Sequence, residues 1–82
     1  MVMTLDELPR GDRAVVTGLE IRGGARRRLM DLGLLPGAAV HAELTSPLGD
    51  PTAYEVRGAL VVLRRDQARA VHVEAHPDDE DR

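Results

Sequence analysis

The sequence predicts a mainly β protein, a small and strongly bent antiparallel barrel of about five strands with one short helix. Short apolar runs, alternating or β-branched, recur along the chain and are separated by Gly, Pro and Asp turn signals. The one segment with helical spacing, near residues 25–32, is short. The chain has 82 residues, which allows one domain that buries roughly 60% of its unfolded surface. Closure into a barrel would protect the edges that a flat sheet exposes.

The first elements are a helical turn and a strand. Residues 4–7 have the spacing of a capping box, which predicts one short helical turn that ends at Pro9. Residues 13–19 are rich in β-branched side chains and lie between turn signals, so they predict the first strand. The Gly-Gly pair at 23–24 is expected to break the chain before the helix.

A short basic helix follows and ends at a glycine. Leu29 and Leu32 lie three residues apart and share one face, so both are expected to pack into the core. Gly33 stands where a left-handed C-terminal cap is needed, and Pro36 prevents the helix from continuing. Three consecutive arginines fan around the helix and cannot all be buried: Arg26, Arg27 and Arg28.

The remaining strands are expected at residues 39–45, 53–57, 59–64 and 71–75. Gly58 separates the second and third of these and predicts a tight hairpin. Between the last two, residues 66–69 are expected to form a single turn. The inward phase of the strands and the apolar face of the helix together predict a core of Val15, Leu29, Leu32, Val40, Leu44, Val56, Leu60, Val62, Val71 and Val73.

The composition excludes several classes of function. The absence of cysteine excludes disulfides and thiolate metal sites. With Tyr54 as its only aromatic residue, the chain lacks the platforms that stack on single-stranded nucleic acid or line proline-binding grooves. The net charge of −3 comes from residues 76–82, an acidic segment expected to be a flexible tail. Without it the body is neutral, which argues against a nucleic-acid partner.

The N-terminus and the hydropathy predict a cytoplasmic location. The first residues have no basic segment followed by an apolar stretch, so they do not resemble a signal peptide. No apolar run approaches the roughly 20 residues that span a bilayer, so direct membrane insertion is not expected.

The order of motifs over about residues 4–75 resembles the FeoA family. The run Arg27-Arg-Leu-Met-Asp-Leu-Gly-Leu-Leu-Pro-Gly37 is similar to that family, together with Gly-Asp-Pro at 49–51 and Tyr-Glu-Val-Arg-Gly at 54–58. The resemblance implies an SH3-like barrel in residues 1–75. It also implies a small cytosolic accessory protein of bacterial ferrous-iron uptake, which acts with the membrane transporter FeoB and its GTP-binding domain.

An alternative role comes from related modules. Similar domains occur at the C-terminal end of DtxR-type metal-dependent repressors, which would make this chain a metal-responsive regulatory module. Because no helix-turn-helix precedes the domain in this sequence, the accessory role is favoured.

The sequence does not predict a catalytic site. The single serine, Ser46, lacks a nucleophile elbow, and the glycine pair lacks the signature of a phosphate-binding loop. We therefore expect no enzymatic activity and no required cofactor.

One strand carries a candidate metal site. His72, Glu74 and His76 alternate along residues 71–76 and project from one face, and such side chains suit zinc or ferrous iron. Residues two apart on a strand are about 6.5–7 Å apart at Cα, which is wide for one small ion. The trio therefore predicts at most a weak surface site. His41 and Glu43 show the same alternation on another strand.

The candidate partner-binding residues form two sets. The first is the arginine cluster Arg26–Arg28, which we expect to meet an acidic surface on the cytosolic part of a FeoB-like transporter. The alternative is an interface on apolar loop residues with no assured place in the core: Leu34, Leu35 and Leu48. The sequence does not decide whether the chain forms a homo-oligomer.

Overall fold

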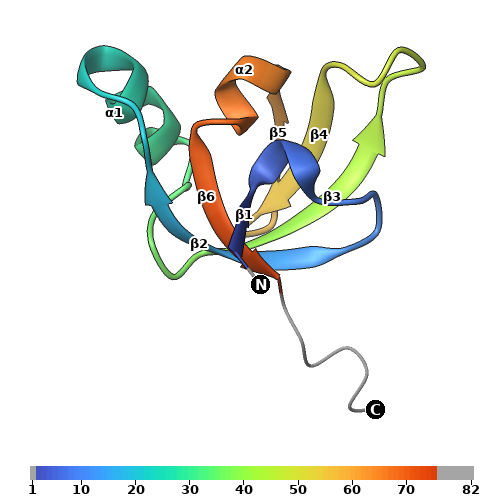
Figure 1. Ribbon diagram of the computed structural model, residues 1–82, viewed down its shortest axis with the longest axis horizontal. Helices are drawn as coiled ribbons and strands as arrows, with labels where there is room; N and C mark the ends of the chain where they lie inside the picture. Colours follow the sequence, from blue (N-terminus) through green and yellow to red (C-terminus); the bar gives the residue numbers. More distant parts are fainter. Residues whose placement is uncertain (1, 76–82) are drawn as a thin grey trace.

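The computed structural model describes residues 2–75 and shows one antiparallel sheet of six strands in the order β1-β6-β2-β3-β4-β5 (Figure 1). The mainly β prediction is confirmed, with one strand more than expected. In chain order the elements are β1 (Val2–Thr4), the 3-10 turn η1 (Leu5–Glu7), β2 (Arg13–Leu19), α1 (Gly23–Asp31), β3 (Ala39–Thr45), β4 (Thr52–Val56), β5 (Ala59–Leu63), α2 (Arg65–Ala68) and β6 (Val71–Ala75). The predicted acidic tail, residues 76–82, lies outside the described residues.

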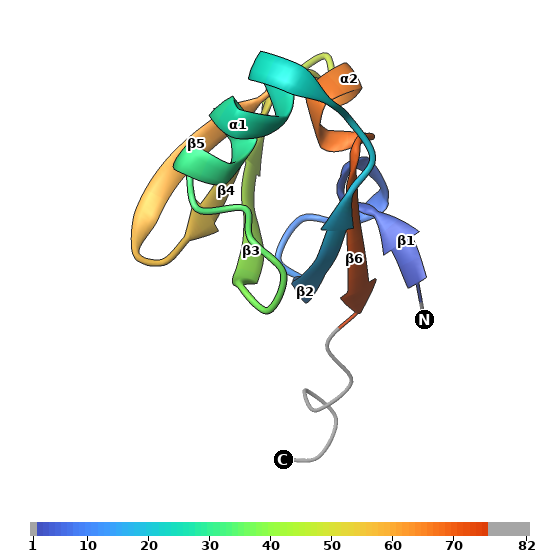
Figure 2. The same ribbon diagram turned by 90° about the vertical axis from the view of Figure 1, so that its left-hand side faces the viewer.

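The sheet bends around the core, with β1 and β5 as its two edge strands (Figures 1 and 2). Both helices and the loop between β3 and β4 lie at the same end of the barrel, as both views show. None of the helices within residues 2–75 has the length and apolar character needed to cross a membrane.

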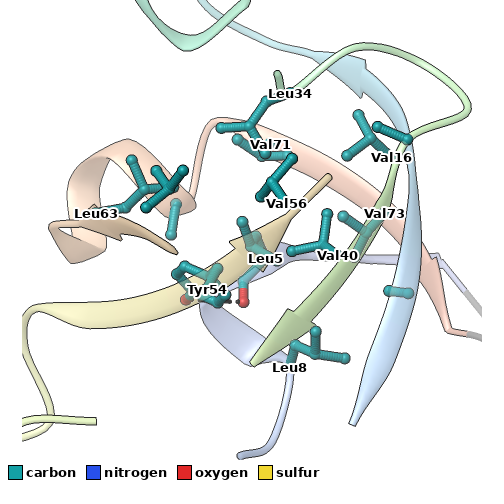
Figure 3. Close-up of a cluster of buried hydrophobic side chains, with 14 of the residues drawn as sticks. Leu5, Leu8, Val16, Leu34, Val40, Tyr54, Val56, Leu63, Val71 and Val73 are labelled. Carbon is teal, nitrogen blue, oxygen red and sulfur yellow. Dashed lines mark hydrogen bonds between the residues drawn. The ribbon is translucent and has the colours of Figure 1, made fainter. Parts of the chain in front are cut away.

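The core is a cluster of aliphatic side chains on the inner face of the sheet (Figure 3). Leu5 from η1 lies among the strand side chains and is completely buried. The hydroxyl of Tyr54 donates a hydrogen bond of 3.4 Å to the Leu5 carbonyl, so its polar end is satisfied inside the barrel. The largest side chains with almost no exposure are Leu5, Leu29, Leu34, Leu63, Val16, Val40, Val56, Val71 and Val73.

Half of the predicted core is confirmed. Leu29, Val40, Val56, Val71 and Val73 are buried, and Val15 is half-buried. The prediction was wrong for four residues with large exposed fractions: Leu32 at 39%, Leu44 at 56%, Leu60 at 62% and Val62 at 60%.

The error in β5 is a phase error. The strand is apolar throughout, so either set of alternating residues could have faced the core. Val61 and Leu63 take the inner face, which leaves Leu60 and Val62 outside.

The error in β3 comes from a bulge. The register with β4 shifts by one residue between Ala42 and Leu44, so Glu43 is an extra residue without a Cα partner on β4. The shift reverses the phase of the strand, and Leu44 turns outward while Ala42 stays buried.

The helix end forms the expected cap. Gly33 has a φ of +101°, as predicted, and its amide donates to the Met30 carbonyl at 2.9 Å. The amide of Leu34 donates to the Leu29 carbonyl at 3.1 Å, which completes a Schellman motif. This motif turns Leu34 into the core beside Leu29, while Leu32 is the cap residue at the rim.

The other local predictions are confirmed with small changes. The Thr4 amide donates to a Glu7 carboxylate oxygen at 3.1 Å, as a capping box requires. The β4–β5 hairpin turns through Arg57 and Gly58, both with positive φ. The glycine pair at 23–24, expected to precede the helix, forms its first turn instead. Gly23 has a φ of +69°, a conformation that glycine adopts without the steric cost of a Cβ.

Candidate functional site

The three predicted arginines lie on the exposed surface of α1. In the described part of the chain, none of them has a carboxylate within 4.0 Å. Arg26 and Arg27 line an open hollow beside the start of the helix, and Arg28 faces the opposite side, towards β5 and α2. The helix therefore presents its positive charges in two directions.

A second hollow, of about 560 Å³, lies where α1, β5 and α2 meet. Arg28 and Leu32 line it from α1, and Val62 lines it from β5. Arg64 and Asp66 lie on the α2 side, so the rim carries two guanidinium groups and one carboxylate. The hollow thus combines apolar side chains with a net positive rim.

The apolar surface extends from this hollow over the outer face of the sheet. Leu44, Ala53 and Val62 lie directly opposite one another on β3, β4 and β5. In the next row Glu55 lies opposite Leu60. Three large apolar side chains, Leu44, Leu60 and Val62, are more than half exposed here, so this part of the outer face is more apolar than a solvated sheet face usually is.

The three apolar loop residues of the alternative interface differ in their exposure. Leu34 is completely buried and cannot contact a partner, so the expectation that it belongs to a docking surface was wrong. Leu35 is half-buried, and Leu48 is 91% exposed in the loop between β3 and β4. This loop lies at the same end of the barrel as α1 (Figure 2).

The predicted metal trio lies only partly within the described residues. The imidazole Nε2 of His72 lies 2.6 Å from a carboxylate oxygen of Glu20. This ring nitrogen is therefore hydrogen-bonded to a residue outside the predicted trio. Glu74 is exposed on the regular part of β6, and His76 lies outside the described residues.

A different group of metal-type side chains comes together on β3 and β4. One ligand atom from each of His41, Glu43 and Glu55 lies within 4.8 Å of the others. The His41 Nδ1 is 2.7 Å from a Glu43 oxygen and 3.9 Å from a Glu55 oxygen. The hydrogen bond to Glu43 raises the pKa of His41 above its ordinary value, against the lowering effect of partial burial.

The sequence pointed to two members of this group but missed the third. The alternation of His41 and Glu43 was visible, whereas Glu55 joins them only through the pairing of β3 with β4. The sequence predicted both strands but not their register. Only the register shows that Glu55 lies opposite His41.

Comparisons with known proteins agree on a family. The model described as the FeoA domain matches residues 3–75. A curated relative, the Fe(2+) transport protein A/Fe(2+) transporter FeoB fusion protein of Porphyromonas gingivalis, is 38% identical over 72 residues. The match covers 88% of this chain but only 8% of that relative, so the chain spans a small part of its length.

Solved structures give the same answer. The solution structure of the FeoA protein from Chlorobium tepidum is 43% identical with a TM-score of 0.86, and the match covers 94% of this chain and 73% of that one. The Stenotrophomonas maltophilia FeoA complexed with zinc, described as a procaryotic SH3 domain protein, is 33% identical with a TM-score of 0.79. That match covers 88% of this chain and 89% of the other, and the predicted SH3-like fold is confirmed.

A manganese-dependent transcriptional repressor is similar at 16% identity and a TM-score of 0.81. The match covers 92% of this chain and 42% of the repressor, and it shows a shared fold alone.

Proposed function

This chain belongs to the FeoA family, which is associated with ferrous iron transport, and we propose that it docks on the cytosolic part of a FeoB-like transporter and supports its activity. The observation that carries the proposal is the fusion relative, whose name joins a FeoA protein and a FeoB transporter in one chain. Proteins that are fused in one organism commonly act together when they are separate. Docking of this kind places the chain in the cytoplasm, at the membrane surface but not within it.

The docking surface that we propose is centred on the hollow between α1, β5 and α2, which Arg28 lines, and it extends over α1 to Arg26 and Arg27 on the other side of the helix. Leu32 and Val62 supply apolar contact area, and Arg28 supplies a guanidinium group at the same place. Arginine is enriched in protein interfaces because its planar group forms paired hydrogen bonds with carboxylates. The complementary surface would be an acidic rim around an apolar anchor on the transporter.

The arginines would act mainly on encounter and orientation. Charges at the rim of an interface steer association, and salt screens them over about 10 Å at 0.1 M ionic strength. The role of Arg26–Arg28 should therefore be visible as a dependence of binding on salt.

The experiment measures binding to the purified cytosolic domain of the FeoB-like transporter from the same organism, at low and high salt. Replacement of all three arginines by glutamine should leave the fold intact, because none of them is in the core. Binding should weaken by at least about 1 kcal/mol, or roughly fivefold, and transporter-dependent iron uptake should fall. Arg10→Gln, an exposed arginine outside α1, is the matched control.

Two other results would revise the proposal. If the triple variant binds normally at both salt concentrations while Leu48→Asp abolishes binding, the interface is the apolar loop and the arginine role is wrong. If the unmodified chain does not bind the transporter domain at either salt concentration, the accessory role itself fails. The regulatory alternative has fold similarity alone behind it.

A further inference from the structure

We propose that His41, Glu43 and Glu55 form a binding site for a divalent transition-metal ion on the outer face of β3 and β4. One imidazole nitrogen and two carboxylate oxygens lie within 4.8 Å of one another. Zinc and ferrous iron accept this mixed set of ligands, whereas magnesium and calcium prefer oxygen alone. The proposal concerns the isolated chain and does not depend on the docking function.

The β-bulge at Glu43 distinguishes this site from a chance alternation of polar residues. Along a regular strand, residues two apart are about 6.5–7 Å apart at Cα and do not converge on one ion. Glu43 is the extra residue of the bulge, and its Oε2 lies 2.7 Å from the His41 Nδ1. Bulges commonly redirect a side chain in this way.

The third ligand comes from the neighbouring strand. Glu55 is the Cα partner of His41 on β4, so its side chain projects from the same face. Its Oε1 lies 3.9 Å from the His41 Nδ1, on the same side of the imidazole as Glu43. Ligand atoms around one tetrahedral zinc ion lie about 3.3 Å apart. Glu43 would therefore move slightly away from the imidazole and Glu55 slightly towards it, and both are flexible, partly exposed side chains.

The imidazole is already oriented for a metal. The Nε2 of His41 lies 3.2 Å from the carbonyl oxygen of Gly11, which can only accept a hydrogen bond. The ring therefore donates its Nε2 proton to the backbone, and without a metal its Nδ1 donates a proton to the Glu43 carboxylate 2.7 Å away. A metal ion at Nδ1 would displace this second proton, while the Nε2 hydrogen bond holds the ring in place. Metal-binding histidines typically donate their other N–H to a carbonyl or carboxylate in this way.

The surroundings limit the strength of the site. Arg13 lies opposite His41 on β2, and its positive charge opposes a cation nearby. The side chains of His41, Glu43 and Glu55 are 33%, 36% and 48% exposed, so water reaches the ligands. Three protein ligands leave a coordination position open for water or for a side chain of another protein.

The strand β6 offers a matched control. His72 and Glu74 have the same His-Xaa-Glu pattern as His41 and Glu43, but the irregularity near them lies in β2, between Val16 and Gly18. His72 is instead bonded to Glu20. If the pattern alone bound metal, both strands would do so. If the bulge and the cross-strand carboxylate are needed, only β3 and β4 will.

The test is calorimetric titration of the metal-free full chain with zinc at mildly alkaline pH, repeated anaerobically with ferrous iron. We expect one ion per chain. His41→Ala, Glu43→Gln and Glu55→Gln should each weaken binding at least about tenfold. His72→Ala and Glu74→Gln should leave the affinity unchanged, and so should His76→Ala.

Nuclear magnetic resonance of the same samples keeps the test independent of folding. Dispersed amide spectra of each variant will show that the barrel is intact, and zinc should shift the imidazole signals of His41 in the unmodified chain. The proposal is overturned if the unmodified chain does not bind zinc or ferrous iron. It is also overturned if binding survives all three changes on β3 and β4, or if it is lost with His72 or His76.

Discussion

The two faces of β5 have nearly the same composition and opposite environments. Val61 and Leu63 point into the barrel and are buried, whereas Leu60 and Val62 point outward and are mostly exposed. The inner pair is surrounded by side chains from the other strands, and the outer pair has no such cover among the described residues. An apolar strand at a sheet edge therefore contributes to stability through one face and leaves the other available for binding.

Stability should separate the two faces most strongly. Leu63→Ala should lower the free energy of unfolding by about 2–5 kcal/mol, because it leaves a cavity in a closed core. Val62→Ala on the outer face should change it by no more than about 0.5 kcal/mol. Denaturant unfolding of both variants measures the difference. Equal effects would show that the outer face is packed against something in solution, and a second copy of the chain would then be the first candidate.

A change at the helix end tests how firmly α1 is attached to the inner face. Gly33 has a φ of +101°, and a Cβ there would lie 3.2 Å from the Val56 Cγ1 on β4. Gly33→Ala should therefore destabilise the protein by about 1 kcal/mol or more.

Gly24→Ala is the matched control for this prediction. Gly24 lies in the first turn of α1 with open space around it. Alanine is the better helix former, so this change should leave the stability unchanged or raise it by up to about 1 kcal/mol. If both variants lose stability equally, the strain at Gly33 is not the cause.

The outer face should matter for binding and not for folding. Val62→Asp places a carboxylate in the hollow beside Arg28, where docking would bury it. We expect the affinity for the transporter domain to fall by at least about 1 kcal/mol, with unfolding unchanged within about 0.5 kcal/mol. Leu44→Asp changes the same face on the other side of β4. It should lower the affinity less than Val62→Asp does if the hollow is the centre of the interface. The reverse order would move the interface to β3.

The sequence predicted those parts of the fold that depend on local chemistry. The capping box at Thr4, the cap at Gly33 and the hairpin at Gly58 each need particular residues at particular dihedral angles, and all three were found. The first strand was missed because its three residues, Val2–Thr4, are too few to show a pattern. The register of long-range pairing has no such local signal.

The register and phase of the strands also limited how much of the candidate docking and metal sites could be predicted. All five residues of β5 are apolar, so the strand gives no sign of which alternate set faces inward, and Leu60 and Val62 were wrongly assigned to the core. Leu34 does lie in a loop, but it was assigned to a docking surface because the predicted helix cap did not show which of the two following leucines turns into the core. Glu55 could join His41 only once β3 and β4 were aligned.

The smallest expected effect is a change of stability with pH at Tyr54, which is buried on the inner face of β4. Burial raises the pKa of its hydroxyl above the ordinary value of about 10, against a lowering hydrogen bond with Thr52. Tyr54 is the only aromatic residue of the chain, so the ultraviolet absorbance of tyrosinate reports this one group. The folded protein should ionise at higher pH than the same chain in urea.

The same shift fixes the sign of a stability change. As the pH rises past about 10, the unfolded chain loses its tyrosine proton before the folded chain does, which favours unfolding. The contribution of Tyr54 is therefore complete below about pH 10 and declines as the pH rises from there to the folded pKa. Tyr54→Phe removes the ionisable group and should flatten this part of the profile. A folded chain that ionises at the same pH as the unfolded one would mean that the inner face opens to water around β4, and the contrast between the two faces of the sheet would then be smaller than the structure shows.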